Sequence, residues 1–203
     1  MTLTLSHGNI LAVFFTANAA ELQHGSHWYP DALAACETIA QSYSLPVDTV
    51  AGVVAALSPN NKWQRNIIDA DNICRIYAAG GHDDAAQCKV STFNGNKQKA
   101  LQILSGIAPL EVLGGLKVRA FYNCILGDDS VCVDGHAFAI WKGERIPIAK
   151  TPTISPKLYA AIASDYRNAA STINAVLGTA YSAAQVQAIT WSVWHRIAKE
   201  IAA

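Results

Sequence analysis

The segment from Leu113 to Trp141 holds the residues best suited to chemistry. Asp134 follows a short apolar run, Val131-Cys132-Val133, and begins a predicted helix together with Gly135. A carboxylate at this position accepts hydrogen bonds from the first turn of the helix, as an ordinary N-cap residue does. A carboxylate can also stabilise a positive charge that develops during a reaction, or take a proton from water. The sequence therefore allows Asp134 to be an N-cap, a catalytic group, or both.

A glycine turn precedes this region. Gly114-Gly115 separates a short predicted helix, Pro109 to Leu113, from a longer one, Leu116 to Ile125. Main-chain N–H groups beside glycines can approach a phosphate closely, and the positive end of a helix dipole favours an anion. Lys117 and Arg119, near the start of the second helix, are either further phosphate contacts or solvated helix charges.

Several amide and aromatic side chains could line a pocket for a flat ligand. Aromatic rings and hydrogen-bonding amides are the groups that surround a base taken out of a nucleic acid. Asn60 and Asn61 are also good helix caps, and a histidine at a helix start often packs or bonds locally. The pocket candidates are Trp28, Tyr29, Asn60, Asn61, Trp63 and His136.

The composition indicates a folded chain without a general affinity for nucleic acid. Of the 203 residues, 51% are hydrophobic and 15% charged, which is enough apolar material for one domain or two packed lobes. The 15 basic and 15 acidic side chains cancel. Because nucleic-acid-binding domains usually carry a basic surplus, any affinity for DNA must come from a local cluster and be modest and salt-sensitive.

The cysteines and histidines predict no metal site. The five cysteines lack the C-x-x-C spacing of zinc and iron–sulfur sites, and the histidines show no ligand spacing. We therefore expect reduced, buried thiols and neither a metal nor another cofactor. No signal peptide and no stretch long enough to span a membrane is visible, so we expect a cytoplasmic protein without a membrane partner.

The rest of the chain is predicted to be helical. Pro156 after Ser155, and the box Ser182-Ala183-Ala184-Gln185, are typical of helix starts. Val131 to Val133 is predicted to be extended. The other predicted helices span Leu5 to Leu22, a segment opened by Tyr29-Pro30-Asp31, Val47 to Leu57, Trp63 to Ala79 and Lys97 to Leu104.

Four landmarks, in order, resemble the helix-hairpin-helix DNA glycosylase superfamily. Val54 to Asn60 resembles its apolar helix ending in Leu-Ser-x-Gln, and Phe93 to Ala100 its Tyr-x-x-Lys-Ala segment. Leu113-Gly114-Gly115-Leu116 is similar to its hairpin, without the hairpin's proline and second glycine. Val133-Asp134-Gly135-His136 resembles its Val-Asp-Thr-His. The flanks, 1–45 and 142–203, look more like phage and actinobacterial proteins that share Trp-Tyr-Pro and Ala-Leu-Ser-Pro motifs.

This resemblance implies an all-α, two-lobed glycosylase-like fold. Residues 46–140 would form the helix-hairpin-helix lobe, and residues 1–45 with 141–203 a second helical lobe of one globular unit. The implied activity breaks the N-glycosidic bond of a damaged or modified base flipped out of DNA. Asp134 would stabilise the sugar cation or activate water, and the pocket candidates would hold the base. Gly114, Gly115, Arg119 and Lys97 would bind DNA.

Lys117 decides whether the enzyme would also cleave the strand. In glycosylases with lyase activity, a lysine at the start of the helix after the hairpin forms a Schiff base with the sugar. Lys117 is the candidate for this catalytic lysine, but it stands one residue closer to the aspartate than that lysine does. Either the turn is one residue tighter than in the family, or Lys117 contacts phosphate and the enzyme is monofunctional; we expect the monofunctional enzyme.

Two other functions are compatible with the same residues. The flanks and the altered hairpin favour a phage-type enzyme that modifies DNA bases on this scaffold. The neutral total charge favours a non-catalytic module that binds DNA or protein. The expected location is the cytoplasm of a bacterium or of a phage-infected host cell.

Overall fold

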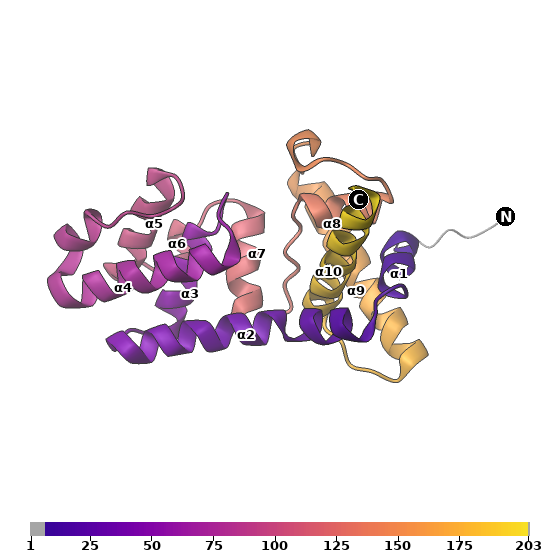
Figure 1. The fold of residues 1–203 in the computed structure, drawn as a ribbon, viewed down its shortest axis with the longest axis horizontal. Coiled ribbons are helices and arrows are strands. Elements are labelled where there is room, and N and C mark those ends of the chain that lie inside the picture. The colour runs from indigo at the N-terminus through magenta and orange to yellow at the C-terminus, as the bar shows by residue number, and fades with distance from the viewer. Residues whose placement is uncertain (1–6, 203) are drawn as a thin grey trace. The chain divides into compact units, whose positions relative to one another are not determined.

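The computed structural model describes residues 7–202, and this part of the chain is helical without any strand, with helices making up 73%. The predicted all-α class is therefore confirmed. No helix within the described range is long and apolar enough to cross a membrane. The elements, labelled in Figure 1, are α1 (Gly8–Phe14), α2 (Ala19–Tyr43), α3 (Val47–Leu57), α4 (Trp63–Ala86), α5 (Asn94–Leu104), α6 (Pro109–Val112), α7 (Leu116–Ile125), α8 (Gly135–Lys142), the 3-10 turn η1 (Ile148–Lys150), α9 (Pro156–Leu177) and α10 (Ala183–Ala202).

The chain divides into two compact units. Of the described residues, 7–29 and 128–202 form the first unit and 30–127 the second. The boundaries therefore differ from the predicted lobes, which began at residue 46 and ended at residue 140. Asp134 belongs to the unit formed by the terminal helices because α8 packs against α1 and α10. The glycine turn at Gly114-Gly115 belongs to the other unit.

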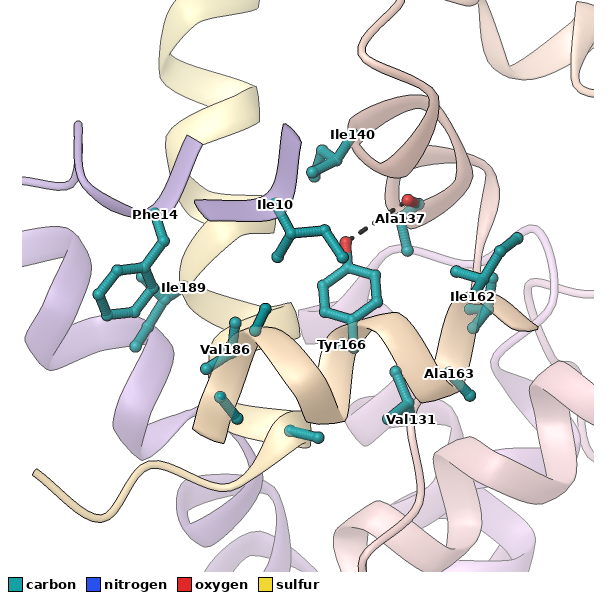
Figure 2. Close-up of a cluster of buried hydrophobic side chains, with 14 of the residues drawn as sticks. Ile10, Phe14, Val131, Ala137, Ile140, Ile162, Ala163, Tyr166, Val186 and Ile189 are labelled. Carbon is teal, nitrogen blue, oxygen red and sulfur yellow. Dashed lines mark hydrogen bonds between the residues drawn. The ribbon is translucent and has the colours of Figure 1, made fainter. Parts of the chain in front are cut away.

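The first unit has a core formed by α1, α8, α9 and α10. Figure 2 shows the ring of Tyr166 in the middle of this core, between Ile10 and Val131, with its hydroxyl directed at α8. That hydroxyl donates to the carbonyl oxygen of Ala137 at 3.4 Å. Ile140 and Ile189 are fully buried in the same cluster. The first turn of α8 is therefore fixed by the core beneath it.

Helix α2 runs through Pro30, so the predicted helix start at Tyr29-Pro30-Asp31 is wrong. Pro30 has no N–H to donate to the carbonyl of Ser26, which would normally weaken a helix interior. Here the Ser26 carbonyl accepts a hydrogen bond from Gln185 Nε2 at 2.9 Å instead. A side chain distant in sequence therefore supplies the hydrogen bond that the Ser26 carbonyl lacks because of Pro30, and the helix continues.

The first predicted helix is also wrong, because it is two helices. Its start at Leu5 lies outside the described residues, and α1 ends at Phe14. Asn18 and Glu21 then form a capping box that begins α2. Asn18 Oδ1 accepts from the Glu21 N–H and Glu21 Oε2 from the Asn18 N–H, both at 2.9 Å. This box satisfies N–H groups that a continuous helix would have paired internally.

Glu21 also joins α2 to α10, which makes this contact dependent on pH. Its Oε1 lies 2.8 Å from Arg196 Nε. Burial raises the pKa of the Glu21 carboxyl, but the hydrogen bonds and charge of Arg196 and the bond from Asn18 outweigh it, so the pKa is lowered overall. A lowered pKa in the folded state means that the unfolded chain binds more protons as the pH falls.

We therefore expect Glu21 to stabilise the fold at neutral pH and to lose this effect in acid. The difference in unfolding free energy between the wild type and Glu21→Gln should be full above the ordinary glutamate pKa, about 4.5. The difference should shrink as the pH falls from about 4.5 through the lowered pKa of the folded state. Urea unfolding across this range measures it, and a difference that stays constant with pH would contradict the assignment.

The second unit is built around α3, as its uniformly apolar sequence predicted. Every residue from Val50 to Leu57 is buried, and α3 packs against α4, α5, α6 and α7. Gly52 allows α6 to come close, since a Cβ there would lie 2.8 Å from the Pro109 ring. Helix α4 extends to Ala86, beyond its predicted end at Ala79, with a break at Gly81, where φ is 78°.

Candidate functional site

The segment that leads to Asp134 is held by the core and by one tyrosine. Val131 and Val133 are buried. The Tyr159 hydroxyl donates to the Val131 carbonyl at 2.8 Å and accepts from the Val133 N–H at 3.0 Å. These bonds to a side chain take the place of the partners that a neighbouring strand would provide. The segment belongs to no sheet, and it places Asp134 at the start of α8.

Asp134 is the N-cap of α8, as predicted. Its Oδ1 accepts a hydrogen bond from the Ala137 N–H at 2.8 Å, and its own carbonyl accepts from Phe138. No hydrogen bond to Oδ2 occurs within residues 7–202, and the residue is half-buried. One carboxylate oxygen thus fixes the helix, and the other is available for a further interaction.

A buried phenol lies close to this carboxylate. Burial is the main reason why the pKa of Tyr166 is raised; the nearby charge of Asp134 raises it further, and a hydrogen bond with Thr190 lowers it. The hydroxyl of Tyr166 therefore stays protonated and directed at the first turn of α8 (Figure 2). Tyr166 thus links the first turn of α8 to Thr190 of α10.

The segment between α8 and α9 covers the start of α8. A Cβ at Gly135 would lie 2.8 Å from Thr151 Oγ1 and 3.0 Å from Ile148 Cδ1, so a larger residue would require these two side chains to move. Arg145 anchors the same segment to α10. Its guanidinium lies 3.5 Å from the ring centroid of Trp194, and Nη1 donates to the Trp194 carbonyl at 2.9 Å. The residue after Asp134 is therefore closely packed.

Aromatic and histidine side chains from three helices meet beside α8. The rings of His136 and His195 have centroids 4.6 Å apart, and Trp191 lies 6.2 Å from the first and 4.0 Å from the second. Trp28 of α2 lies 5.9 Å from Trp191, and His24 lies 5.7 Å from Trp28. We refer to His24, Trp28, His136, Trp191 and His195 as the histidine–tryptophan cluster. All of its members are at least partly exposed.

The sequence predicted only part of this cluster. Trp28 and His136 were candidates, and the structure places them together. Tyr29, the third candidate in this unit, is buried and donates its hydroxyl to Gln187 Oε1 at 3.0 Å. Trp191 and His195 were not predicted. The sequence did contain a pattern that could have indicated them. Gln187, Trp191 and His195 are each four residues apart on α10, so they share one face of the helix.

In the second unit, the glycine turn has the predicted form. Gly115 is the N-cap of α7 with φ of 77°, a conformation that favours glycine, and Gly114, Gly115, Lys117 and Arg119 are exposed. Lys97 is occupied elsewhere, because its Nζ donates to the carbonyls of Ala86 at 2.8 Å and Cys88 at 3.3 Å. Lys99, which was not predicted, points at the turn: its Nζ lies 3.7 Å from the position of a Cβ on Gly114.

One of the two predicted amides of this unit, Asn61, takes part in a structural network. Asn61 Nδ2 donates to Asp69 Oδ2 at 3.1 Å, and the Ser91 N–H donates to the same oxygen at 2.7 Å. Asp69 is fully buried, so this carboxylate ties the loop before α4 to the loop before α5. Asn60 is exposed and has a positive φ of 58°. Trp63 packs its ring edge-on to Phe121 of α7 at 6.5 Å.

The predicted site residues are thus distributed over both units. Asp134, Trp28, Tyr29 and His136 lie in the first. The amides, Trp63, Lys97 and the residues of the glycine turn lie in the second. Within the described part of the chain, no three histidine, cysteine or acidic side chains are placed to hold a metal ion.

Comparison with known proteins identifies the family. No curated protein and no solved structure matches the chain. A family model described as "Family of unknown function (DUF7178)" matches residues 1–198. Since this match covers nearly the whole chain, the protein belongs to the DUF7178 family.

Proposed function

We propose that this protein cleaves the N-glycosidic bond of a base flipped out of DNA, with Asp134 as the group that acts on the sugar. The observation that carries the proposal is the juxtaposition at the start of α8. A half-buried carboxylate with one hydrogen-bonded oxygen lies two residues before His136, a member of the histidine–tryptophan cluster. The four landmarks of the sequence point to the same reaction.

The chemistry of the reaction requires these types of group. When the bond between C1′ and the base nitrogen breaks, positive charge develops on the sugar. A carboxylate stabilises that charge and can take a proton from the water that attacks C1′. Partly exposed tryptophan rings offer a stacking surface that suits any base. The hydrogen bond from the Ala137 N–H holds the carboxylate in place.

Contact with DNA is supported by the glycine turn of the second unit. Gly115 exposes the N-terminus of α7, and Lys117 and Arg119 are exposed near it. Lys99 adds a third positive charge close to Gly114. A turn of this kind can bind a phosphate through main-chain N–H groups, the helix dipole and lysine. With Lys117 in this role, the enzyme is a monofunctional glycosylase.

The reaction itself is tested with purified protein and a panel of oligonucleotides, single-stranded and duplex. The panel carries deaminated, alkylated, oxidised and 5-substituted bases. Mass spectrometry of the products should detect a free base and an abasic strand without strand cleavage. A nucleoside of altered mass that remains in the strand would indicate base modification instead. Unchanged DNA across the whole panel would refute the proposal.

Salt dependence tests the proposed DNA contacts. Each phosphate contact contributes about 0.9 to the slope of log affinity against log salt for duplex DNA. Lys99→Gln, Lys117→Gln and Arg119→Gln should each weaken binding and lower this slope by about that amount. Arg75→Gln, an exposed charge elsewhere on α4, is the matched control and should leave the slope unchanged. Equal slopes for all four variants would contradict the assignment.

A further inference from the structure

The imidazole rings of two histidines in the cluster lie close to each other. His136 is in the first turn of α8 and His195 on α10, and their ring centroids lie 4.6 Å apart with the planes inclined at 58°. Two imidazolium ions at this separation repel each other, so the pair binds its first proton much more readily than its second. The pair therefore accommodates one positive charge more readily than two.

The surroundings of the pair favour one positive charge. Asp134, two residues before His136 on the same turn, is the nearest acid in the sequence of α8, and an anion favours a neighbouring cation. Trp191 lies against both imidazoles, and tryptophan faces attract cations. Other charged and titratable groups lie on the elements packed against α8 and α10. Tyr166 of α9 stays neutral, and His24 of α2 contacts Trp28. Arg196 of α10 pairs with Glu21 of α2. Arg145 lies over the Trp194 ring, and Asp165 of α9 accepts from Trp141 Nε1.

The proposed function does not yet assign a residue to protonate the departing base. As the bond from C1′ to the base breaks, its electron pair moves onto the base nitrogen, and an ordinary base must then gain a proton to leave as a neutral molecule. Water adds its oxygen to C1′ and gives its proton to Asp134. Asp134 acts on the sugar and the water, so the base requires a separate acid.

We propose that the His136–His195 pair is this acid and protonates the departing base. The inference rests on the proposed function. One imidazolium proton passes to the base nitrogen as the bond breaks, and the proton that Asp134 takes from water returns to the pair directly or through solvent. The sum is the hydrolysis of one N-glycosidic bond by one water molecule, with all side chains restored.

The charge of the leaving base separates this role from a structural one. Guanine methylated at N7 already carries a positive charge and leaves as a neutral molecule without a proton. Loss of a general acid should therefore slow the release of uncharged bases far more than the release of this one. A variant that merely distorted the site would slow both equally.

The test measures single-turnover base release between about pH 5 and pH 9 for His136→Gln, His195→Gln and the double variant. His27→Gln, an exposed histidine bonded to its own helix at Gln23, is the control. For an uncharged base, the wild-type rate should fall at high pH. Each variant should lose about 100-fold and most of this dependence. For N7-methylguanine, the loss should be less than about tenfold.

The outcomes distinguish the two proposals. If the wild type releases no base, the proposed function fails and the acid role fails with it. If the wild type releases base, but the variants slow charged and uncharged bases equally or keep the wild-type pH profile, only the acid role is refuted. Proton NMR of the wild type should also show two separated titration steps for the pair and one in each single variant. Two independent titrations would likewise overturn the inference.

Discussion

Asp134→Asn should abolish base release while leaving the protein folded. Asparagine caps helices as well as aspartate does, so the hydrogen bond to the Ala137 N–H is retained. The lost charge removes a favourable interaction with the helix dipole of at most about 1 kcal/mol. The same loss removes the stabilisation of the sugar cation, and we expect a rate reduction of at least about 100-fold.

A second substitution at the same position separates the two roles of this residue. Asp134→Ala removes both the cap and the charge, so it should lose activity and also about 1 kcal/mol of stability. For a chain of this size, that corresponds to a fall of about 2–4 °C in melting temperature. Asp48→Asn, an exposed acid in the first turn of α3, is the control for charge alone. An Asp134→Asn protein with wild-type activity would reduce Asp134 to a structural cap.

Gly25→Ala should strongly destabilise the first unit. A Cβ at residue 25 would lie 2.5 Å from Cα and 2.6 Å from N of Ile189, which are backbone atoms that cannot rotate away. Helices α2 and α10 would have to separate, and overpacking of this kind costs about 1–3 kcal/mol or more. We expect a loss at the upper end of this range, near 3 kcal/mol, measured by urea unfolding.

The same substitution should disturb the histidine–tryptophan cluster. Trp28 is one helical turn from Gly25, and its contact with Trp191 depends on the separation of α2 and α10. Tryptophan fluorescence should therefore change in the folded variant. Gly8→Ala is the matched control, because no atom lies within 4 Å of a Cβ at that glycine. Equal stability of the two variants would show that the close approach of α2 and α10 is not required.

Most helix ends with a local signal could be predicted from the sequence, and the capping box of Asn18 and Glu21 was the exception. Ser155 accepts from the Leu158 N–H, and Ser182 and Gln185 exchange the two hydrogen bonds of a capping box. Asp134 caps α8 as expected. In each case the bonds join residues three positions apart, so all the residues of the cap are present in the local sequence.

Features that depend on residues far apart in the sequence were missed, because no local pattern reports such contacts. Pro30 normally marks a helix start, and its place inside α2 depends on Gln185, which is far away in the sequence. The second half of the histidine–tryptophan cluster comes from α10, which reads as an amphipathic core helix. Lys97 and Lys99 are equivalent in the sequence, and only the backbone carbonyls of Ala86 and Cys88 show which one is occupied.

The central claim is that Asp134 serves bond cleavage between a base and its sugar. The most direct test quantifies free base and aldehydic abasic sites in one reaction, for the wild type and for Asp134→Asn. We predict equal amounts of the two products from the wild type and neither from the variant. Products in unequal amounts, or the same yield from both proteins, would contradict the account.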